Sequence, residues 1–119
     1  MRYLINPVPK PRMTRADKWK HRPATDRYWS FKDEVALNKV DLPASGASVM
    51  FLMPMPKSWS KKKREEMDGK PHVQKPDLDN LLKALCDAVY GEDSCVWHFN
   101  EVSKRWACVG SIVIVQNNV

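Results

Sequence analysis

Two aspartates separated by one residue, with a lysine four residues further on, are the side chains of this chain best suited to chemistry. They are Asp77, Asp79 and Lys83, within the run Lys75-Pro76-Asp77-Leu78-Asp79-Asn80-Leu81-Leu82-Lys83. Carboxylate oxygens are the ligands that hard divalent cations such as Mg²⁺ prefer, and two or three suffice because the ion keeps several waters. The run therefore predicts a metal site with a cationic side chain beside it.

This acidic segment lies in a strongly basic chain. Residues 76–93 hold five acidic residues and one basic residue, a net charge of −4, whereas the whole chain carries +6, so the remaining residues sum to +10. A metal-dependent enzyme that acts on a polyanion needs both signs, because carboxylates hold the ion while lysine and arginine bind the substrate. Cleavage of a phosphodiester bond is the reaction that this distribution of charge favours.

Length and composition indicate a single domain over residues 1–119. A hydrophobic content of 43% is enough for a modest core. The three cysteines and three histidines are scattered, without the close pairs that a zinc site needs. The apolar runs are too short to cross a membrane and nothing resembles a signal peptide, so we expect a cytoplasmic protein.

The pattern of apolar residues predicts an α/β (α+β) fold, in which helices pack on a small mixed sheet. Helices are expected at about residues 26–40, 61–67 and 78–90, and strands at about 2–6, 47–55, 95–107 and 110–116. The helix starts have candidate caps in Asp26, in Ser58 or Ser60, and in Asp77, whose side chain is expected to turn back to the first free amides. Because residues 47–55 are apolar on both faces and rich in Met, Val and Phe, they predict a central strand covered on both sides. The last strand fits either an edge or a buried position.

The helix expected at 78–90 is amphipathic. Its apolar side chains share one face, whereas Asp79, Lys83 and Asp87 fall on the other, so the apolar face is expected on the sheet and the charged face toward substrate. Lys83 lies four residues from Asp79 and four from Asp87, within reach of either carboxylate. The simpler alternative is that these aspartates only complement the helix dipole and form a surface ion pair. That alternative leaves the second acidic pair, Glu92-Asp93, unexplained.

Asp93 is the third candidate metal ligand, but the helix separates it from the first two. A helix of about 13 residues is roughly 20 Å long. Either the chain folds back after Gly91, or Asp93 of one subunit joins Asp77 and Asp79 of a two-fold partner packed antiparallel. We favour the second arrangement, in which the metal site exists only in a homodimer.

Two basic segments are candidates for contact with nucleic acid. One lies between residues 10 and 27, and the other is the charged helix at 61–67, whose lysines precede its glutamates against the preference of the helix dipole. A nearby phosphate backbone would explain that order, although a solvated surface explains it equally well. The candidate DNA-binding residues are Arg12, Arg15, Lys18, Lys61, Lys62, Lys63 and Lys75.

With these residues laid out, the chain resembles the RusA-type Holliday-junction resolvases, small dimeric endonucleases found in bacteria and their prophages. The resemblance spans nearly the whole length. It rests on Asp77-Leu78-Asp79-Asn80-Leu81, Lys83, the Asp87-Ala88 step, Glu92-Asp93 followed by Val96, and the basic segment Pro9-Lys10-Pro11-Arg12. The insertion from Lys57 to Lys75 looks like the phage-type branch of the family.

The resemblance implies a Mg²⁺-dependent endodeoxyribonuclease, with Mn²⁺ as a substitute, that resolves four-way DNA junctions by paired symmetric nicks in recombination and repair. It implies that Asp77, Asp79 and Asp93 hold the ion, that Lys83 is needed for activity, and that the enzyme is a homodimer in the cytoplasm of a bacterial or phage-infected cell. Two alternatives stay open at this point. One is a metal-dependent nuclease for other branched DNA, and the other is a non-catalytic nucleic-acid-binding protein.

Overall fold

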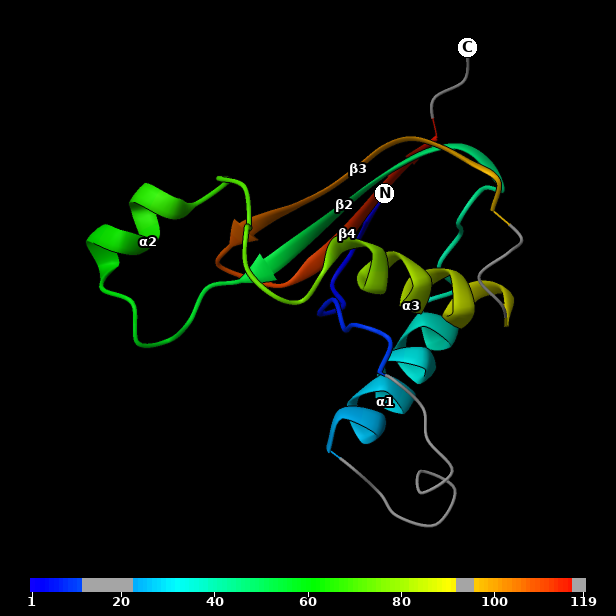
Figure 1. Cartoon of the computed structure of the whole chain (residues 1–119), viewed down its shortest axis with the longest axis horizontal. Helices are drawn as coiled ribbons and strands as arrows, with labels where there is room; N and C mark the ends of the chain where they lie inside the picture. Colours follow the sequence, from blue (N-terminus) through cyan, green and yellow to red (C-terminus); the bar gives the residue numbers. More distant parts are fainter. Residues whose placement is uncertain (12–22, 92–95, 117–119) are drawn as a thin grey trace.

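A mixed four-stranded sheet and three helices form the parts of the chain that this computed structural model describes, residues 1–11, 23–91 and 96–116 (Figure 1). In chain order the elements are β1 (Arg2–Tyr3), α1 (Pro23–Leu37), β2 (Ser45–Pro54), α2 (Lys61–Met67), α3 (Leu78–Tyr90), β3 (His98–Ala107) and β4 (Ser111–Gln116). The predicted fold class, α+β with a mixed sheet packed by helices, is confirmed.

The sheet has the order β1-β4-β2-β3, so β2 is an interior strand as its apolar sequence predicts. β2 pairs parallel with β3 and antiparallel with β4, and β4 in turn pairs antiparallel with β1. β4 is therefore an interior strand as well, which decides between the two positions left open for it. The parallel β2–β3 pair is joined by a long crossover that contains α2 and α3, and this crossover carries the acidic segment.

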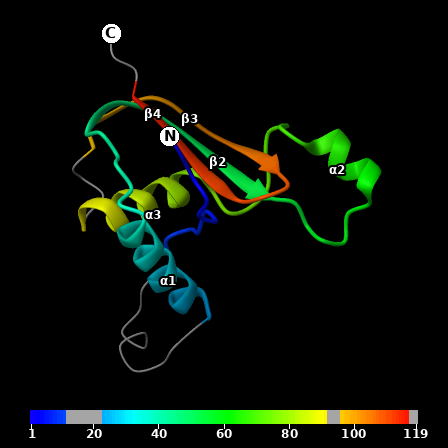
Figure 2. The same cartoon turned by 180° about the vertical axis from the view of Figure 1, so that it is seen from behind.

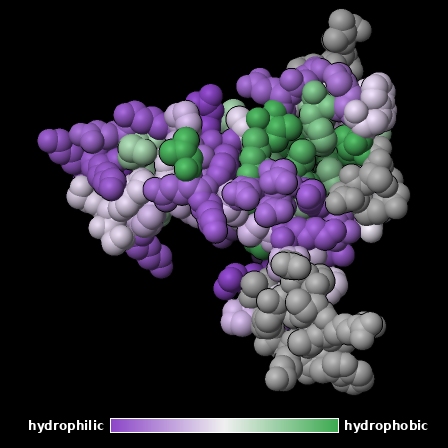
Figure 3. Space-filling view, in the orientation of Figure 1, coloured by the Kyte–Doolittle hydropathy of each residue, from purple (hydrophilic) through white to green (hydrophobic). Residues whose placement is uncertain are grey.

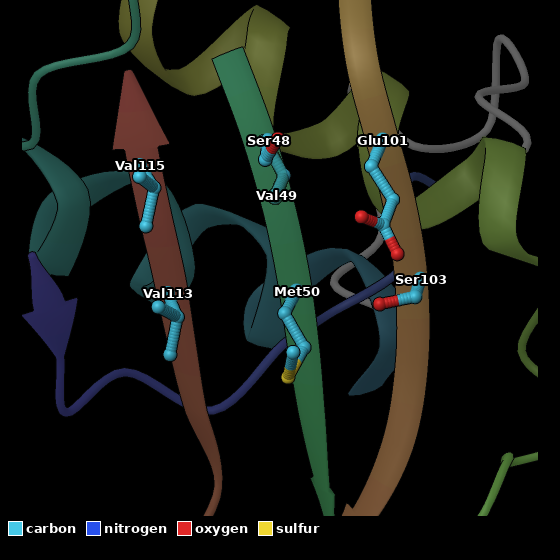
Figure 4. Close-up of a pocket in the computed structure, with 7 residues that line it drawn as sticks. All are labelled: Ser48, Val49, Met50, Glu101, Ser103, Val113 and Val115. Carbon is cyan, nitrogen blue, oxygen red and sulfur yellow. The ribbon is translucent and has the colours of Figure 1, made fainter. Parts of the chain in front are cut away.

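Among the described residues, helices cover one face of the sheet and not the other, which corrects the expectation that β2 is covered on both sides. Ala47, Val49, Phe51 and Met53 alternate along β2, and all are buried in one core with residues of α1 and α3. The opposite face is open between β4, β2 and β3, where Figure 4 shows side chains that point away from the helices. These side chains belong to Ser48, Met50, Glu101, Ser103, Val113 and Val115. An apolar run such as 47–55 does not reveal that its second face lacks a covering layer.

The largest differences between the expected and the observed boundaries are in three elements. α1 begins at Pro23 rather than at Asp26, because proline at a first helical position has no N–H to satisfy and already holds a helical φ. Asp26 lies within the first turn instead of capping it. β1 is shorter than expected, since the Ile5 N–H donates to the Tyr3 carbonyl (2.8 Å) and the chain turns there. β3 begins at His98 rather than at residue 95, and residues 92–95 lie outside the described part of the chain.

α2 lies in an arm, residues 56–70, that projects from the end of the sheet, as the two opposite views show (Figures 1 and 2). Of the two candidate caps for this helix, Ser60 is the one used, and it accepts the Lys63 N–H at 3.2 Å. Trp59 fixes the base of the arm by packing on Trp106 of β3, with ring centroids 4.7 Å apart. α2 buries no residue and the arm surface is largely hydrophilic (Figure 3). The arm is thus free to contact another molecule.

Among the helices of the described residues, we find none with the length and apolar character that crossing a bilayer requires.

Candidate active site

The site is built on α3, which is held against the sheet by its apolar face. Leu81, Ala84 and Leu85 have no exposed surface, whereas Asp79 and Lys83 on the other side of the helix are exposed. The predicted bounds of this helix, 78–90, are confirmed. Gly91 ends the helix in the left-handed conformation (φ 79°) and donates its N–H to the Asp87 carbonyl at 2.8 Å. Because the buried face cannot rotate, the direction of the charged face is fixed.

Asp77 occupies the N-cap position of α3, as expected, but its carboxylate does not cap the helix. The residue has extended backbone angles (φ −67°, ψ 144°) and its side chain makes no capping hydrogen bond. The expectation that this side chain turns back to the first amides is therefore wrong. Because the residue is exposed and its carboxylate does not cap the helix, the carboxylate oxygens are available to a ligand.

Asp79 and Lys83 form the predicted i,i+4 ion pair, with 3.7 Å between Oδ2 of the aspartate and Nζ of the lysine. Both side chains are more than half exposed, at 68% and 51%. An exposed pair at this separation contributes little to stability because solvent screens it. Asp79 can thus exchange its lysine partner for a cation without a large loss of folding free energy. Two adjacent, weakly engaged carboxylates fit the oxygen-rich coordination of Mg²⁺.

Asp87 has a different partner from the one expected. It accepts hydrogen bonds from the Tyr28 hydroxyl and from Lys32 Nζ (3.3 Å), both on α1, rather than pairing with Lys83. Eight residues of helix place Asp87 about 80° around the axis from Asp79, on the flank that meets α1. Burial alone raises the pKa of Asp87, but the hydrogen bonds from Tyr28 and Lys32 outweigh it and the pKa is lowered. Asp87 therefore joins two helices, and its side chain is 13% exposed.

A shallow hollow beside Asp77 is flanked by two cations. It is lined by Pro9, Lys10, Lys75, Pro76, Asp77 and Asn80. The Lys10 N–H donates to the Asn80 carbonyl at 3.1 Å, which ties the N-terminal segment to the first turn of α3. Lys75 thus lies next to the acidic cluster, as its position in the sequence suggests. Lys10 was not among the candidate residues, because only the folded chain brings it to α3.

The loop before α3 is held by a second lysine that sequence reasoning missed. Lys104 of β3 donates from Nζ to the carbonyl oxygens of Gln74 and Pro76, the second at 2.6 Å. A single lysine within a strand gives no signal in the sequence. Its partners are about 30 residues away along the chain, and they are backbone atoms.

Several candidate residues are not brought together with Asp77 and Asp79. Within residues 1–11, 23–91 and 96–116 there is no group of three or more His, Cys, Asp or Glu side chains that could hold a metal ion. Asp93, Arg12, Arg15 and Lys18 lie outside the described residues, so their predicted roles stay predictions. Lys61, Lys62 and Lys63 are exposed on α2, in the arm rather than on α3. The described part of the site consists of two carboxylates with cationic side chains around them.

This arrangement can bind a divalent cation and a phosphate group side by side. The carboxylates at the start of α3 offer oxygen ligands, while Lys10, Lys75 and Lys83 offer positive charge to a phosphodiester. A family model described as endodeoxyribonuclease RusA matches residues 5–114 of the chain. No curated protein and no solved structure matches it.

We predict that Asp87→Ala lowers the free energy of unfolding by about 1–3 kcal/mol at pH 7, because it removes the acceptor of hydrogen bonds from Tyr28 and Lys32. Since the pKa of Asp87 is lowered from 3.8 in the folded protein, its contribution is present above pH 3.8 and is lost as the pH falls through the lowered value. Urea unfolding of both proteins at pH 7 and near pH 3 measures this, and the difference between them should shrink at the acidic pH.

Asp79→Ala is the matched control, because Asp79 lies on the same helix but makes only an exposed ion pair. We expect it to change stability by less than about 0.5 kcal/mol. Equal stability of wild type and Asp87→Ala at pH 7 would contradict the bridging role of Asp87.

Proposed function

Since the chain belongs to the RusA family of endodeoxyribonucleases and is therefore a Holliday-junction resolvase, we propose that Asp77, Asp79 and Asp93 hold a Mg²⁺ ion for this reaction. The observation that carries the proposal is the pair of exposed carboxylates at the start of α3, one of which makes no capping bond and the other only a long ion pair. Membership of an enzyme family removes the non-catalytic alternative. Nucleases of this class generally need a divalent metal, and Mn²⁺ is expected to substitute for Mg²⁺.

The residues around the proposed site have distinct tasks. When bound, the cation supplies Lewis-acid activation of the scissile phosphate and of the attacking water. Asp77 and Asp79 fix its position at the helix start. Lys83 lies one turn along the same face, and its exposed ammonium can approach the phosphate and offset negative charge on the non-bridging phosphate oxygens or on the departing 3′ oxygen. Lys10 and Lys75, which line the hollow together with Asp77, orient the phosphodiester there.

We also propose that the active enzyme is a homodimer with a metal site shared across its interface. Asp77 and Asp79 lie at the start of α3, and Gly91 ends it after 13 residues, a helix length of about 20 Å. Asp93 follows shortly after that far end. A partner packed antiparallel brings its own Asp93 to Asp77 and Asp79, and a two-fold axis produces two identical sites for paired symmetric nicks.

DNA binding is proposed to use lysines and arginines of the arm, of the basic N-terminal segment and of the hollow beside Asp77. Lys61, Lys62 and Lys63 are exposed at the start of α2, and Lys75 lines the hollow beside Asp77. Arg12, Arg15 and Lys18 are proposed on charge alone. Contacts of this kind hold the phosphate backbone and position a junction without reading its sequence.

The cellular role proposed for this activity is DNA recombination and repair in the cytoplasm of a bacterial or phage-infected cell. Residues 1–119 are proposed to work as one domain, in which the arm and α3 act on the same DNA molecule. The phage-type insertion that forms the arm is consistent with a prophage origin.

We predict that Asp79→Asn abolishes cleavage of a labelled four-way junction in Mg²⁺, by about 1,000-fold or more, while junction binding in EDTA changes by less than about threefold. The substitution removes a metal ligand but hardly changes the basic surface that dominates binding affinity. Cleavage is followed on denaturing gels, and binding by mobility shift.

Asp68→Asn is the control, because Asp68 is an exposed aspartate at the end of α2 and not on α3. It is expected to cleave at the wild-type rate. Cleavage by Asp79→Asn at the wild-type rate would contradict the metal proposal. If the wild type cuts a flap and a linear duplex as fast as it cuts the four-way junction, its activity is that of a general nuclease.

A second prediction concerns the arm. Replacing Lys61, Lys62 and Lys63 together by Gln should make the negative slope of log affinity against log salt concentration shallower by about 2 to 3. The reason is that each phosphate contact releases counterions, and the variant makes fewer such contacts. Binding titrations at four or more salt concentrations give this slope. Lys39→Gln, at an exposed lysine just after α1 and outside the arm, should leave the slope unchanged. An unchanged slope in the triple variant means that the arm does not contact the phosphate backbone.

A further inference from the structure

The loop that leads into α3 runs along the free edge of the sheet. β3 is one of the two edge strands, and Pro71 forms an antiparallel bridge with Arg105. The His72 N–H donates to the Lys104 carbonyl and the Trp106 N–H donates to the Lys70 carbonyl, each at 3.0 Å. These backbone hydrogen bonds stop at His72, four residues before Pro76. The segment between His72 and α3 needs another anchor if Asp77 is to have a defined position.

The Lys104 side chain provides that anchor. Its Nζ atom donates to the carbonyl oxygens of Gln74 and Pro76, which lie on either side of Lys75. The Pro76 carbonyl belongs to the peptide group that ends at the Asp77 nitrogen, so the hydrogen bond of 2.6 Å acts one residue from the proposed metal ligand. An ammonium group on a carbonyl oxygen makes a charge-assisted hydrogen bond, which is stronger than one between neutral groups.

We propose that Lys104 is a positioning residue for the metal site, which holds the 74–76 loop so that the Asp77 carboxylate and the Lys75 ammonium face the same phosphate. This inference rests on the proposed function of Asp77 and Asp79. Lys104 itself touches backbone oxygens and not the reacting atoms. Groups that orient metal ligands in this way typically affect metal affinity by about 10–100-fold when they are removed.

The test is Mn²⁺ binding by the full-length protein in the absence of DNA, measured as free Mn²⁺ by electron paramagnetic resonance. Lys104→Met keeps most of the side-chain length but loses all three donors, and we expect it to lower Mn²⁺ affinity about tenfold or more and kcat by a similar factor. Junction binding in EDTA should change by less than about threefold, since the basic surface stays. Lys104→Arg should recover affinity to within about threefold, because its fork of N–H donors can reach two carbonyls.

Arg105→Met is the matched control. Arg105 is the next residue of the same strand, and its Nη1 donates at 2.9 Å to the Gly69 carbonyl at the arm end of the loop. We expect wild-type Mn²⁺ affinity in this variant. A loss equal to that of Lys104→Met would overturn the specific role of Lys104, and so would wild-type Mn²⁺ affinity in a folded Lys104→Met protein.

Two further measurements keep the outcome decisive. If Lys104→Met does not fold by circular dichroism, Lys104→Gln replaces it, and unchanged Mn²⁺ affinity in that folded variant overturns the inference. Asp79→Asn is measured in the same assay. If it binds Mn²⁺ like the wild type, the proposed metal site is wrong; if it loses binding while Lys104→Met does not, only the role of Lys104 is wrong.

Discussion

The packing of α3 on the sheet is the constraint on which the rest of this structure depends. Leu81, Ala84 and Leu85 are fully buried against one face of the sheet, and burial of each leucine side chain contributes about 1.5–3 kcal/mol. This contact fixes both the rotation and the direction of the helix. Asp77 and Asp79 are consequently held at one end of the helix, and Gly91 lies at the other.

Other contacts hold α3 against α1 and fix the loop that precedes it. Asp87 joins α3 to α1 through Tyr28 and Lys32, while Lys104 and the main chain of β3 hold the loop that precedes the helix. Neither Asp77 nor Asp79 is used in these structural contacts. Asp87 therefore contributes to the stability of the fold, whereas Asp77 and Asp79 stay exposed among lysines. This arrangement suits the binding of a cation and a phosphate better than it suits the stability of the helix.

Local patterns in the sequence predicted the elements that carry their own signals. The leucine spacing and the Gly91 stop fixed the bounds of α3, and Ser60 with its charged run fixed those of α2. Long-range relations were missed, because nothing local encodes them. Asp87 lies four residues from Lys83 and yet bonds to α1, since its angle on the helix turns it toward that neighbour. Lys10 and Lys104 reach the site through tertiary contacts alone. The sequence of β2 likewise does not reveal that, in the described part of the chain, helices cover one face of the sheet and leave the other open.

The most direct test of a metal site shared between subunits is to mix two inactive variants, Asp79→Asn and Asp93→Asn, each with a different affinity tag. The doubly tagged heterodimer is purified and its nicking of a four-way junction in Mg²⁺ is measured. If the site is shared, one of the two sites in this heterodimer contains no substitution, and we expect single-strand nicking at about half the rate of a wild-type heterodimer prepared in the same way. If each subunit builds its own site, both sites are defective. No nicking by the heterodimer, with an active wild-type control, would contradict the account.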